Sequence, residues 1–597
     1  MKKVKNQTPK KLIAFDFETT SIKEGTPEVL YLTAFGENDF KLSAPITGKP
    51  KNKLKLLRDI IEQRLLIPEN NGAQFVGWNS NKFDSYFIAK ALLESDRWIL
   101  HPYMTATKAL RGLRVIEKLS VEEKEKLHNK GQKLLQFEFL DGMAMTGVAA
   151  PLKKFLKTFA PDYQKLDGPN FDAGEKFNPN NKNHVLYAER DSEGLYFAMH
   201  KVSEIVKELT NLDLKPTVGN LAIHHFMDHV PEGVILKRPT DKLLQVLHGD
   251  VKRGGYCWAM KQYHGPVWKY DINQAYAAAM RDAHLPSGDC ATTSEYIDGQ
   301  PGIYYCTFSR KKLRKVPFYY KQEKQGLFTI GKKPVSAWLT SIEIEHLKKD
   351  EWQVKIDGGY VWESSFNMKH FVDRLEKLRG TDPEGPSGPL GTMVKSIGNN
   401  AYGKTLEQVW GQEFVFSKER PDGYDLYDSF NPEAYFIFSR DRKSFPKKYH
   451  LPQIGIFVTA HVRCVVREAA IKEEDHFLYA DTDCVMFSKP AKHLEVHKTK
   501  YGAWKQESDG YTIIVVGKKM YHAPDGSKAK GLIVKKLEKS DYLSWLKGKL
   551  PIQIQVQRQN IISFLGGKDM FKNLTRKGTD VNLSKTVKFL EGYFVPA

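Results

Sequence analysis

Two acidic residues stand close together inside an apolar segment of the chain, residues 477–487. Asp481 and Asp483 have apolar residues on both sides, which predicts two short strands joined by a tight turn. Carboxylates beside an apolar core are costly to bury unless a cation compensates them, and a hard divalent metal acting on a phosphate would do so. Taken alone, an Asp-x-Asp turn is more often a solvated hairpin end, so this interpretation depends on the rest of the chain.

The first half of the chain carries a second set of acids on three separate segments. Residues 12–20 and 75–84 are predicted to form apolar strands that contain or run into acids, and residues 183–209 are predicted to form a helix. Side chains two apart share a strand face and side chains four apart share a helix face. Four acids and a tyrosine suit two-metal phosphodiester hydrolysis, in which carboxylates hold the cations and a hydroxyl orients the attacking water. The candidates are Asp16, Glu18, Asp84, Asp191 and Tyr187.

A third group of candidates lies in the second half. Residues 268–276 are predicted to form a short strand that ends at Asp271, followed by an alanine-rich, helix-prone stretch. An acid at a strand end, close to the N–H groups of a helix start, can receive a metal and a triphosphate. Lys395, Asn399 and Tyr402 stand on one stripe of a predicted helix, which suits a nucleotide, although an exposed amphipathic helix would fit that stripe as well.

The order and spacing of the first-half residues resemble the three motifs of DEDDy-type 3′–5′ proofreading exonucleases. The matching segments are Asp16-x-Glu18, Asn79-x-x-x-Phe83-Asp84 and Tyr187-x-x-x-Asp191. The resemblance implies that the four acids bind metals, that Tyr187 places the water, and that Asn79 holds a single-stranded primer end. Lys165 stands where related phage enzymes carry a catalytic-site lysine. Asp141 ends another apolar run and is expected to be structural.

The second-half residues resemble, in family order, the motifs of family B DNA polymerases. Asp271, Lys395-x-x-x-Asn399-Asn400-Ala401-Tyr402-Gly403 and Asp481-Thr482-Asp483 resemble motifs A, B and C. Arg253-Gly254-Gly255, Thr459-Ala460-His461-Val462-Arg463 and Lys519-Met520-Tyr521 resemble the linker, template-contacting and primer-strand motifs. Gln274, Ala277, Asn400 and Cys484 depart from the residues usual in the family, and none of these departures removes a catalytic carboxylate. The resemblance implies a DNA-directed DNA polymerase with 3′–5′ exonuclease activity.

The resemblance also implies individual roles. Asp271 and Asp483 would bind two Mg²⁺ ions, for which Mn²⁺ could substitute, and Asp481 would assist directly or through water. The implied nucleotide-binding residues are Lys395 and Arg379 on the triphosphate, Tyr276 against a ribose 2′-OH, Tyr402 on the nascent pair, and Asn399. The implied DNA-contacting residues are Asn79, Arg253, Gly254, Gly255, Arg463, Lys519 and Tyr521.

The expected fold is α/β and multidomain: an N-terminal ribonuclease H-like exonuclease domain, then a right-hand polymerase with palm, fingers, thumb and inserted terminal-protein-type subdomains. Extra segments between motifs A and B and between motifs B and C are the mark of the protein-primed phage branch, which implies a terminal protein as primer and strand displacement. The expected boundaries are 1–205 for the exonuclease domain, 206–255 for the linker region, 256–300 for the palm with motif A, 301–368 for a first insertion that contacts terminal protein and DNA, 369–403 for the fingers, 404–452 for a second insertion serving strand displacement and processivity, 453–535 for the palm with motif C, and 536–597 for the thumb.

Composition agrees with a nucleic-acid partner. The 597 residues include 41% hydrophobic residues, which is typical of a globular protein, and carry a formal net charge of +20, which favours a polyanion. The five cysteines are scattered and form no C-x-x-C pair, which argues against a disulfide framework or a zinc site. No secretion or membrane signal is present, so we expect a cytoplasmic protein. The resemblance to phage enzymes implies a monomer in a bacterial host. Primer-template DNA, the displaced strand and dNTPs are the expected partners.

Three alternatives compete with this interpretation. The first is a family B replicase that uses ordinary or self-made primers. The second, of a different class, is a DEDDy exonuclease or DNA-binding repair factor with an inactive polymerase half, and the presence of all three polymerase acids argues against it. A scaffold that only binds nucleic acid would fit the charge but would leave both acid sets unexplained.

Overall fold

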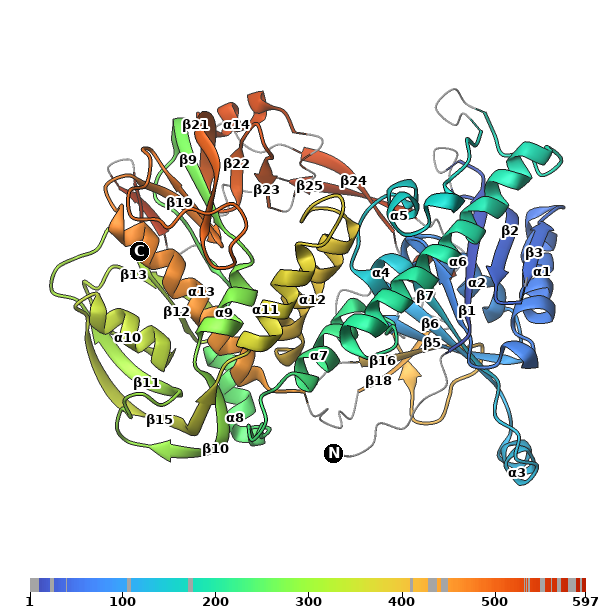
Figure 1. Cartoon of the computed structure of the whole chain (residues 1–597), viewed down its shortest axis with the longest axis horizontal. Coiled ribbons are helices and arrows are strands. Elements are labelled where there is room, and N and C mark those ends of the chain that lie inside the picture. The colour runs from blue at the N-terminus through green and yellow to red at the C-terminus, as the bar shows by residue number, and fades with distance from the viewer. Residues whose placement is uncertain are drawn as a thin grey trace.

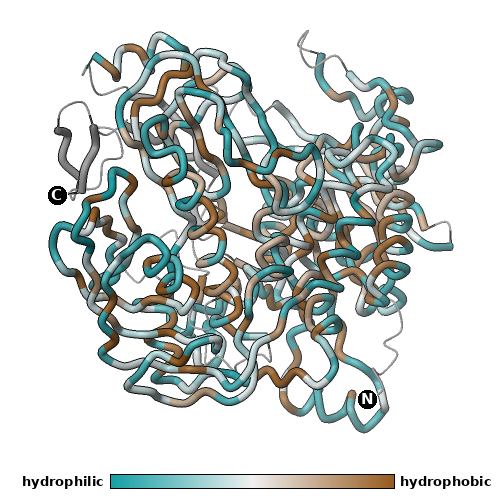
Figure 2. Tube along the Cα trace, turned by 60° about the vertical axis from the view of Figure 1, so that its left-hand side comes forward, coloured by the Kyte–Doolittle hydropathy of each residue, from teal (hydrophilic) through white to brown (hydrophobic). Residues whose placement is uncertain are grey.

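The computed structural model describes residues 10–21, 26–38, 40–104, 109–169, 175–407, 412–427, 437–441, 449–530, 532, 534, 537–547, 553–559, 561–565, 571–577, 587–590 and 593–596. Figure 1 shows two halves side by side: an N-terminal half built on a mixed sheet, and a second half built around an antiparallel sheet and a long central helix. In Figure 2, hydrophobic segments run through the interior of both halves. Within the described part of the chain, no helix is long and apolar enough to cross a membrane.

The N-terminal half is a mixed sheet with helices on both faces. Its strands are β1 (Leu12–Thr19), β2 (Val29–Gly36), β3 (Lys41–Pro45), β4 (Gln74–Gly77), β5 (Trp98–Met104), β6 (Leu110–Glu117), β7 (Gln136–Asp141), β16 (Gln412–Phe416), β17 (Asp425–Leu426) and β18 (Ile437–Asp441). Its helices are α1 (Pro50–Ile60), α2 (Asp84–Leu93), α3 (Val121–Asn129), α4 (Gly142–Thr146), α5 (Leu152–Phe159) and α6 (Lys182–Thr210). Among the described residues the strand order is β17-β18-β16-β5-β6-β7-β4-β1-β2-β3, with parallel pairing of β1 with β4 and of β4 with β7.

The alternation of β1 decides which side chains reach the candidate site. Phe15 and Phe17 pack into the core that the sheet forms with α2. Asp16 and Glu18 therefore point to the other face, where α6 crosses β1 and β2 (Figure 1). The strand predicted over residues 12–20 and the helix predicted over residues 183–209 are both present.

Two later segments join this N-terminal half, which the expected boundaries did not anticipate. β16, from the predicted second insertion, pairs with β5 through Phe416 and Leu100 and so extends the sheet at its edge. Near the C-terminus, α15 (Ile561–Leu565) packs Phe564 against Phe87 of α2, with ring centroids 5.6 Å apart. Part of the predicted thumb is thus anchored on the predicted exonuclease domain.

The second half is built around an antiparallel sheet, as predicted for the palm. Its strands are β8 (Tyr256–Ala259), β9 (Tyr263–Ile272), β19 (Phe477–Thr482), β20 (Cys484–Phe487), β21 (Trp504–Gly517), β22 (Met520–His522) and β23 (Lys528–Ala529). Among the described residues their order is β23-β22-β21-β9-β20-β19-β8, and every neighbouring pair is antiparallel. The helices α9 (Ala275–Asp282) and α13 (Pro452–Lys472) pack together, and α13 also contacts β19.

A second, smaller sheet is inserted after α9. Its strands are β10 (Leu285–Thr293), β11 (Gly302–Ser309), β14 (Val335–Thr340) and β15 (Gln353–Phe366), in the order β10-β15-β11-β14. The hairpin β12 (Phe318–Gln322) and β13 (Gln325–Thr329) and the helix α10 (Ser341–Lys349) complete it. Because β10 pairs with β15, this insertion begins near residue 285 and not at the expected residue 301.

Among the remaining helices, α7 (Val218–Asp228), α11 (Lys369–Arg379) and α12 (Pro389–Thr405) lie between the two halves (Figure 1). In the predicted fingers segment, α11 and α12 pack together, and α12 also contacts α7. The linker region continues with α8 (Asp241–Val246). The chain ends with α14 (Lys539–Leu546) and the hairpins β24 (Gln553–Gln559) with β25 (Phe571–Lys577), and β26 (Val587–Leu590) with β27 (Tyr593–Pro596).

Two candidate active sites

Three acids of the first-half set meet where β1 lies against α6. Asp16, Glu18 and Asp191 each offer a carboxylate oxygen, and these atoms lie within 4.8 Å of one another. Asp84 is the first residue of α2, and it lines a cavity of about 740 Å³ together with Asp16, Glu18 and Asn79. The structure therefore brings three of the predicted acids to one cavity, and Asp191 lies beside two of them.

The electrostatics of this cluster favour a bound cation. Burial raises the pKa of Asp16 to about 7, and repulsion by Asp191 adds to this effect. Burial and the neighbouring acids raise the pKa of Glu18 to about 9. Among the described residues, Asp191 Oδ1 is buried without a hydrogen-bond partner. Crowded carboxylates with an unsatisfied oxygen fit a divalent metal ion, which prefers oxygen ligands.

Lys165 and Tyr187 stand beside the same cluster. The Nζ atom of Lys165 forms an ion pair with Asp191 and lies 4.5 Å from the ring centroid of Tyr187. Burial opposes the charge of Lys165, but Asp191 and Tyr187 hold its pKa above the ordinary value. Burial raises the pKa of Tyr187 to about 12, so its hydroxyl stays protonated at neutral pH. A cation and a hydroxyl group therefore accompany the acids.

Asp141 has the structural role that was expected. Its Oδ1 accepts hydrogen bonds from the backbone N–H of Asn79 (3.1 Å) and of Met143 (2.8 Å), and its Oδ2 accepts from the N–H of Asn81 (3.2 Å). These bonds hold Asn79 in the left-handed region, with φ 61°. Asp141 thus shapes the turn that brings Asn79 to the cavity.

The polymerase-type acids Asp271 and Asp483 converge in the central sheet. β9 and β20 pair so that Asp271 lies opposite Cys484, and the N–H of Ile272 donates to the carbonyl of Asp483 over 2.8 Å. Thr482, at φ 71°, makes the tight turn between β19 and β20. Burial and the charge of Asp483 raise the pKa of Asp271 to about 7. Two acids more than two hundred positions apart in the sequence therefore lie in one site. A bound cation would relieve the repulsion between their carboxylates.

Asp481, at the end of the same hairpin, pairs with two lysines. Its Oδ1 accepts from Lys519 Nζ (2.6 Å) and its Oδ2 from Lys528 Nζ (3.0 Å), while its side chain is 2% exposed. Burial works in the opposite direction, but the two lysines hold the pKa of Asp481 below its usual value. Both carboxylate oxygens are engaged by ammonium groups, so Asp481 anchors two lysines beside the turn.

Lys528 is a site residue that the sequence did not reveal. It stands on the two-residue strand β23, in no motif, and only the pairing of β23 with β22 brings it to the hairpin. Lys519, from the predicted primer-strand motif, donates to the same acid. Its own backbone lies in the left-handed region, with φ 58°. Tyr521 of that motif is buried, with its ring 5.5 Å from that of Tyr479. The structure therefore places Tyr521 in the core beneath the site.

The predicted nucleotide-binding residues lie on three helices, α9, α11 and α12. Tyr276 and Tyr402 stack on each other with centroids 4.4 Å apart and an interplanar angle of 19°. Burial raises the pKa of both Asp271 and Asp483, and the charge of Lys395, which is exposed on α12, partly opposes that rise. Half-buried Asn399 lies one turn further along the same helix. Arg379 ends α11 and donates through Nε to the carbonyl of Pro386 (3.1 Å), in the loop that leads to α12.

The linker residues are the clearest correction. Arg253 and Arg463 were expected to contact DNA, but both side chains are buried and form ion pairs with Glu343. Gly254 lies in open space, with nothing within 4 Å of a hypothetical Cβ. A Cβ on Gly255 would come within 2.9 Å of Thr482 Cα. Of the two glycines, Gly255 is therefore the one that allows a close backbone approach, and it approaches the turn at Thr482, between Asp481 and Asp483.

Comparison with known proteins agrees with this geometry. Residues 171–425 match the family described as DNA polymerase type B, organellar and viral. The chain is similar to a probable DNA polymerase of Neurospora intermedia, with 22% identity over 509 residues that cover 78% of this chain and 50% of that protein. It is also similar to the DNA-directed DNA polymerase of Enterobacteria phage PRD1, with 21% identity over 347 residues that cover 54% of this chain and 57% of that protein. The matched regions thus span about half the length of these curated relatives.

The solved fold of the phi29 DNA polymerase matches nearly the whole chain. Its ternary complex with primer-template DNA and incoming nucleotide superposes with a TM-score of 0.71 at 17% identity, covering 95% of this chain and 99% of that one. The chain is thus similar in sequence to type B DNA polymerases and shares the fold of the phi29 DNA polymerase. The chain therefore has the multidomain α/β fold that the sequence predicted.

Proposed function

We propose that this protein is a DNA-directed DNA polymerase that also degrades DNA from the 3′ end. The observation that carries the proposal is the convergence of Asp271 and Asp483 on adjacent strands beside Lys395. A second acid cluster, around Asp16 and Asp191, supports the hydrolytic activity. Primer-template DNA and dNTPs are the proposed substrates, in keeping with the phi29 complexes that share this fold.

For synthesis, each group has a defined task. Mg²⁺ bound by Asp271 and Asp483 would lower the pKa of the primer 3′-hydroxyl and neutralise the departing pyrophosphate. Lys395 would neutralise triphosphate charge from the face of α12, and Arg379 would do so from the end of α11. Tyr276 and Tyr402, now stacked on each other, would separate to receive the nucleotide.

For 3′ degradation, the cavity beside β1 would hold the frayed primer end. Asn79 lines that cavity and would hold the terminal nucleotides through its amide. The Tyr187 hydroxyl would orient the attacking water. Lys165, paired with Asp191, would stabilise negative charge that develops on the phosphate.

The priming mode extends this proposal. The small sheet after α9 and the strands β16 to β18 occupy the positions of the extra segments expected in the protein-primed branch. We therefore include a terminal protein as the primer, strand displacement during synthesis, a monomeric state, and replication of a phage or mobile-element genome in the cytoplasm of a bacterial host. Transfer of a nucleotide to a separately encoded protein would distinguish this mode from the use of ordinary primers.

One gel tests the proposed activities. A labelled primer-template, placed ahead of a downstream strand, is incubated with Mg²⁺ with and without dNTPs. The wild-type protein should extend the primer when dNTPs are present and shorten it when they are absent. Asp483→Ala should lose extension and keep degradation, and Asp16→Ala with Asp84→Ala should do the reverse. A wild-type protein that does neither would refute the proposal.

A further inference from the structure

The linker between the two halves touches the polymerase-type hairpin. A Cβ added to Gly255 would meet Thr482 at 2.9 Å from both Cα and Cγ2, so the two backbones are in direct contact. From the next residue onward, β8 pairs with β19, which places Cys257 opposite Asp481. The position of residues 253–255 therefore bears directly on the turn that carries Asp483.

Arg463 of α13 holds this linker segment from behind. Its Nη1 donates to the carbonyls of Arg253 and Gly254, each over 3.2 Å. The Arg253 side chain turns away from the hairpin and donates through Nη1 to the carbonyl of Tyr319 over 2.8 Å. Two guanidinium groups thus hold two consecutive linker residues, Arg253 and Gly254, directly before Gly255.

Both guanidinium groups depend on one acid from the inserted sheet. Glu343 Oε1 accepts from Arg463 Nη2 at 2.8 Å, and Glu343 Oε2 accepts from Arg253 Nη2 at 2.5 Å. The side chains of Arg253, Arg463 and Glu343 are 0%, 4% and 1% exposed. Without this carboxylate, two buried positive charges would face each other with no counter-charge.

Glu343 caps a helix in addition to binding the two arginines. It is the N3 residue of the capping box of α10, in which the N–H of Thr340 donates to Oε2 over 3.1 Å. A neutral glutamine would keep that bond. The two arginine contacts need the negative charge, so the charge of Glu343 is required for holding the linker and not for starting the helix.

We propose that Glu343 is a positioning residue for nucleotide addition, acting from the inserted sheet through Arg253 and Arg463 on the linker and hence on the catalytic turn. This inference rests on the proposed polymerase function. Glu343 touches neither acid of the site. Its effect is to keep Gly255 pressed against Thr482, which holds the carboxylates of the hairpin at their working distance.

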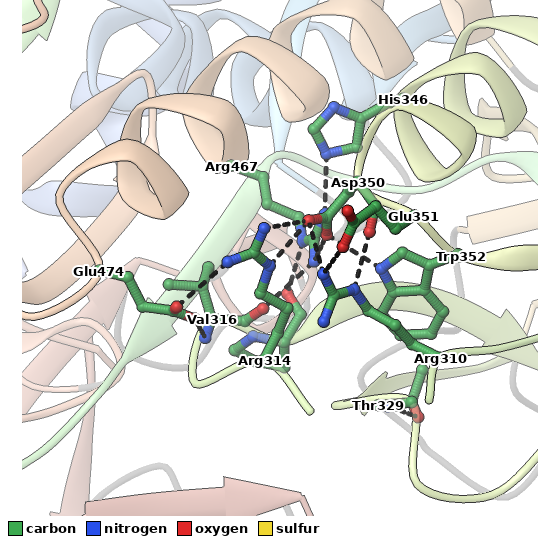
Figure 3. A network of polar contacts seen from close by, with 12 residues as sticks. Arg310, Arg314, Val316, Thr329, His346, Asp350, Glu351, Trp352, Arg467 and Glu474 are labelled. Atoms are coloured by element: carbon green, nitrogen blue, oxygen red, sulfur yellow. Dashed lines mark hydrogen bonds and ion pairs between the residues drawn. The ribbon is translucent and has the colours of Figure 1, made fainter. Parts of the chain in front are cut away.

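A neighbouring cluster provides a matched control. Figure 3 shows Asp350, seven residues further along the inserted segment, with the guanidinium groups of Arg467 and Arg314 gathered around it. Asp350 accepts from Arg467 Nη2 (2.9 Å) and Arg314 Nε (2.7 Å), and its side chain is 5% exposed. Arg467 stands one helical turn after Arg463 on α13. Asp350 therefore joins the end of α10 to α13 through the buried Arg467, but none of its described hydrogen bonds reaches residues 253–255.

The experiment compares Glu343→Gln and Asp350→Asn in the full chain. Measurements are kcat and KM for single-nucleotide incorporation, 3′ degradation of single-stranded DNA, and the melting temperature. For Glu343→Gln we expect kcat to fall about 10- to 100-fold, as a misplaced reacting group would cause, with KM for dNTP and the degradation rate within about threefold of wild type. For Asp350→Asn we expect a similar drop in melting temperature, with kcat within about threefold of wild type.

The kcat values of these variants test the positioning role of Glu343. Wild-type kcat in Glu343→Gln, or an equal loss in Asp350→Asn, would overturn the positioning role. If Glu343→Gln does not fold, Glu343→Asp replaces it: this variant keeps the charge on a shorter side chain, and we expect it to retain folding with an intermediate kcat. Wild-type kcat in Glu343→Asp would then count against the inference. A wild-type protein without incorporation would defeat the proposed function itself and not this inference.

Discussion

Adding one methyl group to Gly255 should disturb synthesis more than any other change of that size in the linker. The new Cβ of Gly255→Ala would lie 2.9 Å from Thr482 Cα, and ordinary contact begins at 3.4 Å, so the two backbones must separate by about 0.5 Å. Overpacking of this kind costs about 1–3 kcal/mol of folding free energy. Because the displaced residue lies between Asp481 and Asp483, we expect kcat for incorporation to fall by about 10- to 100-fold.

The neighbouring Gly254 provides a matched control for this prediction. Gly254→Ala adds the same methyl group where nothing lies within 4 Å, so its kcat should stay within about twofold of wild type. Both variants are assayed by single-turnover incorporation, with degradation of single-stranded DNA and thermal melting measured in parallel. Equal rates for the two variants, or a Gly255→Ala protein as active as wild type, would show that the linker does not set the geometry of the hairpin.

Three further predictions follow from particular contacts. Lys528→Met removes one of the two cations on buried Asp481, and we expect a loss of about 1 kcal/mol in chemical denaturation and about a tenfold slower extension; unchanged extension would count against the anchor role. Lys165→Ala leaves Asp191 without its ion pair, so degradation of single-stranded DNA should slow by about 10- to 100-fold while extension is unaffected; an equal effect on both activities would contradict this. After treatment with EDTA, added Mg²⁺ should raise the melting temperature because it relieves repulsion among buried acids, and Asp16→Asn should reduce that rise; a rise of the same size in the variant would argue against metal binding there.

Features with a short-range pattern could be predicted from the sequence. The alternation in residues 12–20 put Asp16 and Glu18 on one face, and β1 does so because Phe15 and Phe17 fill the opposite core. The apolar flanks of Asp481 predicted a hairpin, and β19 and β20 form it. In each case the signal and the structure span fewer than a dozen residues.

Features that depend on distant partners could not be predicted. Arg253 and Arg463 lie in segments that resemble DNA-contacting motifs, but a basic residue in a sequence does not reveal that Glu343 will bury it. Lys528 carries no motif, and it reaches Asp481 only because β23 joins the sheet edge. The pairing of β16 with β5, through Phe416 and Leu100, joins segments about three hundred positions apart. These contacts join residues that come together only when the whole chain has folded.

The central claim is that Asp271 and Asp483 act together in one site. The measurement is the incorporation rate of Asp271→Asn, Asp483→Asn and the double variant under single-turnover conditions, with degradation of single-stranded DNA as the internal control. We expect each single variant to lose at least about a thousandfold in rate, as removal of several kcal/mol of charge stabilisation would give, and the double variant to be no slower than either. Substantial extension by either single variant, or losses that multiply in the double variant, would contradict a shared site.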